Sequence, residues 1–83
     1  MKETKDVILF FSAEWCGPCK EVKKYLTEEV MKDLNIKNVD ISEDIDLATK
    51  YFVSSVPTFV KIKNGTKEKM YTGRLTLEQL KSF

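Results

Sequence analysis

Two cysteines, Cys16 and Cys19, are the side chains of this sequence best suited to chemistry. They stand three positions apart in Trp15-Cys16-Gly17-Pro18-Cys19, and the chain contains neither a third cysteine nor any histidine. The absence of histidine excludes Ser–His and Cys–His nucleophilic mechanisms and every metal site that needs an imidazole ligand. The pair is left with reversible disulfide chemistry, a thiolate metal site or simple burial.

The type of each residue in this segment fits the start of a helix that has Cys16 at its N-cap. A helix start carries free N–H groups and a partial positive charge, which favours the thiolate of Cys16 over its thiol. Pro18 is tolerated in the first turn because its missing N–H would have no partner there. Gly17 lets the backbone lie close to an incoming partner. Cys19, inside the turn, is expected to be the less exposed cysteine, and the bond between the two should be readily made and broken.

The first half of the chain supplies the elements that must position this pair. The continuous apolar run Val7–Phe11 predicts a central strand that is covered on both faces. Apolar residues at helical spacing predict one helix from Cys19 to about Leu34. Ile36–Ile41 predicts a second strand, which the intervening helix would make parallel to the first.

A short second helix is predicted after that strand. Ser42-Glu43-Asp44 offers an N-cap and acidic first-turn residues, and Pro57 limits how far the helix can run. The residues expected to form one apolar face of this helix are Ile45, Ala48, Tyr51 and Phe52.

A hairpin and a last helix follow. Thr58–Lys63 and Glu68–Thr72 predict two strands, and Asn64-Gly65 between them suits a turn with two positive φ angles. Thr76-Leu77-Glu78-Gln79 is a capping box that predicts a helix start at Thr76. The order β-α-β-α-β-β-α therefore predicts an α/β fold with a four-stranded mixed sheet and helices on both faces.

The composition limits the classes of binding partner and the cellular compartment that we expect for this protein. The 14 basic and 13 acidic residues give a formal charge of +1, which offers no electrostatic case for nucleic acid or an anionic membrane. No apolar run is long enough to span a membrane, and Val7–Phe11 is too short for a signal-peptide core, so a cytoplasmic protein is expected. Because disulfides rarely persist there as structural bonds, the cysteines are interpreted as catalytic. We expect no bound metal, although two chains could supply four thiolates to one zinc ion.

Several motifs in the correct order resemble those of the thioredoxin family. The segment from Ala13 to Lys20 after an apolar strand is similar to the active-site segment of thioredoxins. Val56-Pro57-Thr58 resembles the loop that carries a cis-proline beside the dithiol. Lys63-Asn64-Gly65 resembles the family's hairpin, and Gly73 resembles the glycine after its last strand.

The resemblance implies a minimal thioredoxin-like fold, as a single domain over residues 1–83, and a protein-disulfide reductase. Cys16 would attack a substrate disulfide and Cys19 would resolve the mixed disulfide. Pro57 would be cis and pack against the dithiol, while Val56 would lend its backbone to an extended substrate. The implied substrate-binding residues are Trp15, Gly17, Pro18, Val56, Pro57 and Gly73. No cofactor would be bound, and NADPH would supply electrons through a flavin-dependent thioredoxin reductase to a monomer.

The sequence departs from the thioredoxin pattern in three respects. Only six residues precede Val7, so the family's first strand and helix are expected to be absent, which would make Ile36–Ile41 a sheet edge that could pair with another chain. The family's buried acid falls at Phe10, and its lysine partner falls near Asn38. The short length and Ser55-Val56-Pro57 are also similar to glutaredoxins. A glutathione-recharged enzyme and a redox-switched binding module therefore remain alternatives.

Overall fold

The computed structural model describes residues 6–83. Residues 1–5, the first part of the predicted domain, lie outside the described residues. The elements in chain order are β1 (Asp6–Ser12), α1 (Gly17–Tyr25), α2 (Glu28–Leu34), β2 (Ile36–Asp40), α3 (Ile45–Lys50), β3 (Thr58–Lys63), β4 (Thr66–Thr72) and α4 (Leu77–Lys81).

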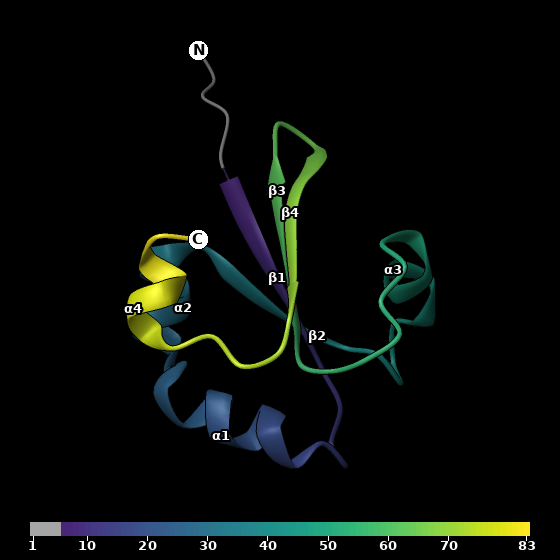
Figure 1. Cartoon of the computed structure of the whole chain (residues 1–83), viewed down its shortest axis with the longest axis horizontal. Coiled ribbons are helices and arrows are strands. Elements are labelled where there is room, and N and C mark those ends of the chain that lie inside the picture. Colours follow the sequence, from purple (N-terminus) through teal and green to yellow (C-terminus); the bar gives the residue numbers. More distant parts are fainter. Residues whose placement is uncertain (1–5) are drawn as a thin grey trace.

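The four strands form one mixed sheet with the order β2-β1-β3-β4. β1 runs parallel to β2 and antiparallel to β3, and β3 runs antiparallel to β4. Helices α1, α2 and α4 lie on one side of the sheet and α3 lies on the other (Figure 1). Each face has its own cluster of buried apolar side chains. The predicted α/β architecture, with a central β1 covered on both faces, is therefore confirmed.

The prediction of one helix from Cys19 to about Leu34 is wrong, because the chain forms two helices there. α1 ends at Tyr25, and α2 begins after Thr27, whose hydroxyl oxygen accepts a hydrogen bond from the Val30 N–H at 3.2 Å. Thr27 has extended backbone angles and so interrupts the helix as an N-cap. The apolar spacing continues across the break, which explains why the pattern indicated a single helix.

The prediction for α3 also needs correction at both ends. Its N-cap is Asp44, whose carboxylate accepts from the Leu47 N–H at 3.1 Å, rather than Ser42. The helix ends at Lys50, and Phe52, expected on its buried face, is 80% exposed. Ile45 at the other end is 64% exposed. The second cluster of buried side chains therefore takes Ala48 from this helix, with Leu47 and Tyr51 packed against it.

The hairpin and the last helix form as predicted, except that β4 begins at Thr66, two residues before the expected start at Glu68. Asn64 and Gly65 have φ angles of 55° and 80°, as a tight turn of this kind requires. Thr76 is the N-cap of α4, and both hydrogen bonds of its capping box with Gln79 are present. Leu80 is buried in the larger cluster.

The segments that the sequence analysis identified as functional lie together at one end of the strands. Phe11 near the end of β1 pairs with Thr58 at the start of β3, and Thr58 pairs with Thr72 at the end of β4. Three segments consequently meet at this end of the strands: the loop that follows β1, the loop that precedes β3 and the residue that follows β4. In the described part of the chain, no helix is long and apolar enough to cross a membrane.

Candidate active site

Cys16 is the N-cap of α1, as the sequence predicts. Its backbone is extended, with φ −90° and ψ 109°, and its Sγ accepts a hydrogen bond from the Cys19 N–H at 3.1 Å. The two cysteines form a disulfide, and their Cα atoms lie 5.2 Å apart. The non-helical backbone of Cys16 brings its sulfur to that of Cys19 across the first turn.

The charges along α1 leave the positive end of its dipole without a neutralising side chain. No acidic residue occupies the first turn, and Lys23 and Lys24 stand in the last turn, where they complement the negative end. After reduction of the disulfide, the same N–H group and dipole would stabilise a Cys16 thiolate.

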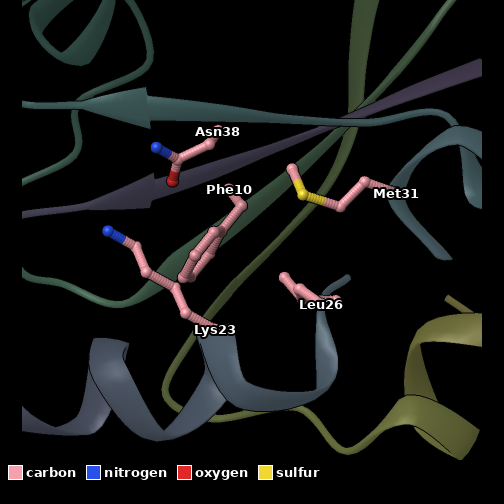
Figure 2. A pocket seen from close by; sticks show the side chains of 5 residues that line it. All are labelled: Phe10, Lys23, Leu26, Met31 and Asn38. Atoms are coloured by element: carbon pink, nitrogen blue, oxygen red, sulfur yellow. The ribbon is translucent and has the colours of Figure 1, made fainter. Parts of the chain in front are cut away.

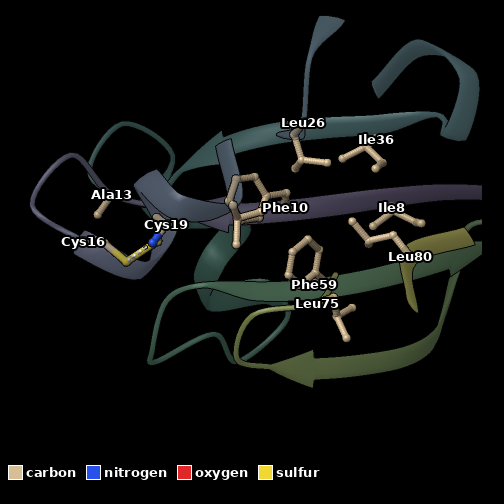
Figure 3. Close-up of a cluster of buried hydrophobic side chains, with 11 residues drawn as sticks. Ile8, Phe10, Ala13, Cys16, Cys19, Leu26, Ile36, Phe59, Leu75 and Leu80 are labelled. Carbon is tan, nitrogen blue, oxygen red and sulfur yellow. Dashed lines mark hydrogen bonds between the residues drawn. A yellow bond between two sulfur atoms is a disulfide. The ribbon is translucent and has the colours of Figure 1, made fainter. Parts of the chain in front are cut away.

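Both cysteines are buried, and Cys16 is the more exposed of the two. Cys19 is completely buried and Cys16 is 4% exposed, whereas the neighbouring Trp15 is 72% exposed. The disulfide lies at one end of the larger apolar cluster (Figure 3). Solvent therefore reaches the disulfide only through the small exposed part of Cys16.

Two loops complete the surroundings of the disulfide. The Val56–Pro57 peptide bond is cis, as the resemblance predicted. Val56 packs against the apolar cluster that contains both cysteines, and Pro57 is buried. The Gly73 N–H donates a hydrogen bond to the Pro57 carbonyl at 2.8 Å, which holds the two loops together.

Gly73 occupies a position that other residues would rarely adopt. Its φ is +131°, and a Cβ atom placed there would lie 3.3 Å from the ring of Tyr71. The backbone angle favours a glycine here, and another residue would also have to displace the Tyr71 ring by a few tenths of an ångström.

A cavity of about 270 Å³ lies between α1, α2 and the sheet. Figure 2 shows its lining side chains: Phe10, Lys23, Leu26, Met31 and Asn38. Phe10 pairs directly with Asn38 across the strands, and its ring stacks on Phe59 with 5.0 Å between centroids. The two positions predicted for the family's buried acid and its lysine partner are thus neighbours. In this chain they are occupied by the ring of Phe10 and the amide of Asn38.

Sequence reasoning missed two polar side chains near the site. Ser12 is fully buried and donates its hydroxyl to the Asn38 side-chain oxygen at 2.9 Å; its place directly after an apolar run was the available signal. The Tyr25 hydroxyl donates to the Leu75 carbonyl. Burial raises the pKa of Tyr25, and the charge of Arg74 opposes that rise. Nothing in the sequence pattern indicated the contact between Tyr25 and the segment before α4.

Within residues 6–83, no three acidic, cysteine or histidine side chains gather where they could hold a metal ion. A metal site at the cysteines would therefore need ligands from a second chain.

The chain matches known proteins over nearly its whole length. The family model described as Thioredoxin matches residues 1–83. Mitochondrial thioredoxin of Mus musculus is 40% identical over 80 residues, which cover 93% of this chain and 48% of that protein. Thioredoxin of Pseudomonas aeruginosa is 36% identical over 87 residues, covering 100% of this chain and 80% of that protein. The chain thus spans about half the length of the mammalian relatives and most of the bacterial one.

Solved structures agree with these sequence matches. A mutant thioredoxin from Halobacterium salinarum has a TM-score of 0.77 and 30% identity over 93% of this chain and 69% of that one. A thioredoxin-2 described as part of the protein secretion machinery of the malaria parasite has a TM-score of 0.83 at 23% identity, covering 99% of this chain and 82% of that one, and supports the fold alone. The family model, the similar sequences and the shared fold show that this chain belongs to the thioredoxin family.

Proposed function

We propose that this protein is a thiol–disulfide oxidoreductase that reduces disulfides of other proteins. The observation that carries the proposal is the position of Cys16. Its sulfur lies at the N-cap of α1, accepts the Cys19 N–H and is paired with a buried second cysteine. This combination supplies one nucleophile with a small exposed surface and one fully buried resolving thiol.

Both steps of the reaction exchange one sulfur–sulfur bond for another. The Cys16 thiolate attacks one sulfur of the substrate disulfide, and the other substrate sulfur leaves as a thiolate. Cys19 then loses its proton and attacks the Cys16 sulfur, which releases the second substrate thiolate. The substrate gains two electrons, and the protein is left with the Cys16–Cys19 disulfide.

The proposed substrate-binding surface consists of Trp15, Gly17, Pro18, Val56, Pro57 and Gly73. Support comes from the hydrogen bond between Gly73 and Pro57 and from the packing of Val56 against the apolar cluster that contains the cysteines. An extended substrate segment could pair with the backbone of Val56, as in short β-augmentation.

We further propose that the protein acts as a monomer of one domain, residues 1–83, in the cytoplasm. No cofactor is needed for the exchange itself. NADPH would supply the electrons through a flavin-dependent thioredoxin reductase. Family membership supports this cycle, whereas the mitochondrial relatives show that the family also occurs in another compartment.

The direct test is reduction of insulin, driven by NADPH and a thioredoxin reductase. We expect turnover with the wild-type protein and none with either Cys16→Ser or Cys19→Ser. Cys19→Ser should accumulate a mixed disulfide with the substrate, because the first step remains possible, and Cys16→Ser should not.

The rival functions predict different results. Activity on a glutathione mixed disulfide, with none through the reductase, would identify a glutathione-recharged enzyme. Undiminished partner binding and cellular function in both serine variants would identify a binding module instead.

A further inference from the structure

The backbone of Arg74 is held in place by the contacts of the residues before and after it. Gly73 is bonded to the Pro57 carbonyl at 2.8 Å, and Leu75 is buried and accepts the Tyr25 hydroxyl. The backbone of Arg74 is therefore fixed one residue from the loop that carries the cis peptide, while its side chain is exposed. Consecutive Cα atoms are about 3.8 Å apart, so Arg74 borders the proposed substrate-binding surface.

The side chain lines a groove of about 450 Å³ between α1 and the segment that precedes α4. The lining residues are Glu21, Lys24, Tyr25, Arg74 and Thr76. Within the groove, the Glu21 carboxylate already pairs with Lys24 at 3.5 Å. Arg74 forms no ion pair with any residue of the described part of the chain.

The groove consequently presents an arginine whose charge is not compensated by the nearby carboxylate. The guanidinium group binds carboxylates through two parallel hydrogen bonds, which a lysine cannot reproduce. Because the backbone on either side is anchored, the loss of freedom when a partner binds is limited to the Arg74 side chain.

We propose that Arg74 is a specificity-determining residue that selects protein substrates with an acidic side chain close to the reactive disulfide. The proposal rests on the proposed function, because it names the substrates that the same dithiol would prefer. The acidic side chain would enter the groove beside Gly73 while the substrate disulfide meets Cys16.

The test uses single-turnover oxidation of the reduced protein by disulfide-bonded peptides, with excess reductant removed beforehand. The two protein thiols become a disulfide as the peptide disulfide becomes two thiols, so no further reactant is needed. Trp15, the one tryptophan of the chain, reports the reaction by its fluorescence. The peptides differ at one position, which carries Glu, Gln or Lys, and the position is moved from one to three residues on either side of the cysteine.

At one such position, we expect the Glu peptide to react roughly threefold to tenfold faster than its Gln counterpart at low ionic strength, with the advantage shrinking in salt. Arg74→Gln should bring that ratio to about one or two, mainly by slowing the reaction of the Glu peptide. Arg74→Lys should restore part of the preference. Lys67→Gln, which removes the same charge at the opposite end of β4, is the matched control and should behave as wild type.

Three results would overturn the proposal while leaving the proposed function intact. The wild-type protein could reduce all peptides at equal rates. An acidic preference could survive Arg74→Gln, which would assign it to the lysines of α1. A dependence on Arg74 could appear with glutathione disulfide but with no peptide, which would assign the groove to a small acidic thiol. Failure to reduce any peptide would instead contradict the proposed function.

Discussion

Phe52 has a backbone conformation that its side chain does not favour. Its φ is 57°, and its N–H bonds to the Thr49 carbonyl, while the next N–H, of Val53, bonds to Ala48. These two bonds are those of a Schellman motif, in which glycine usually occupies the left-handed position. Two asparagines, which tolerate positive φ, hold the other such non-glycine positions between residues 6 and 83.

Replacement of Phe52 by glycine should stabilise the protein. The left-handed conformation costs a non-glycine residue about 1–2 kcal/mol, and the extra backbone entropy of glycine offsets about 0.5–1 kcal/mol of the gain. Because the phenylalanine side chain is 80% exposed, little packing is lost. We expect Phe52→Gly to raise the free energy of unfolding in urea by about 0.5–1 kcal/mol.

Asn64→Gly is the matched control, because asparagine already tolerates its φ of 55°. Its effect should be smaller than that of Phe52→Gly. A decrease in stability on replacing Phe52 would show that its ring contributes to the fold.

The reactive residues themselves were predictable from sequence, whereas their surroundings were only partly so. The N-cap position of Cys16 follows from local chemistry, because glycine and proline at the next two positions suit a first helical turn. The left-handed conformation of Phe52 depends on where α3 ends, which tertiary packing decides. The position of Arg74 depends on the contact between Tyr25 and Leu75, which lie far apart in sequence.

At the scale of elements, the break between α1 and α2 is stabilised by the side chain of Thr27. The Thr27 hydroxyl caps α2, and Glu28 and Glu29 follow in its first turn, where their charges complement the helix dipole. A threonine followed by two acids was the available sequence signal for this boundary. It was hidden by the apolar positions, whose helical spacing does not change across Thr27.

Thr27→Ala should destabilise the protein by about 1 kcal/mol, because the Val30 N–H loses its acceptor. Urea denaturation followed by circular dichroism would measure the change. Thr27→Ser keeps the hydroxyl and should cost clearly less. Equal losses for the two substitutions would mean that the methyl group, and not the cap, accounts for the effect.

The other elements show which boundaries local chemistry decides. The hairpin turn and the capping box of α4 require particular residues at particular positions, and both were predicted correctly. The start of α3 was ambiguous because Ser42 and Asp44 are both good caps. The carboxylate of Asp40 accepts the Ser42 N–H at 2.8 Å, so Ser42 lies in a turn that precedes the helix.

At the scale of the whole molecule, both edges of the sheet carry features that discourage pairing with another chain. β2 is five residues long and exposes Lys37 and Asn38. Every residue of β4 is exposed, and Lys67, Glu68 and Lys69 are consecutive there. Short, charged edge strands are the usual protection against edge-to-edge association.

We therefore expect the 83-residue chain to sediment as a monomer of 9.6 kDa at micromolar concentrations. Lys37→Val should promote self-association, since it removes the charge that interrupts the β2 edge. Lys50→Val on α3 is a control with the same change of charge away from the edge. A stable wild-type dimer would contradict this account of β2.

The position of β1 in the sheet also determines at which stage of folding Cys16 reaches its native surroundings. β3 and β4 are neighbours in sequence, whereas β1 bonds to β2 and β3 through distant pairs such as Ile8–Ile36 and Phe10–Phe59. Short loops close at a smaller entropic cost, so the C-terminal hairpin should assemble early and insertion of β1 should come late. Until that insertion, the N-terminus of α1 is not held in its final place around Cys16. The rate at which the Cys16 thiol is alkylated at neutral pH would thus report on the final step of folding.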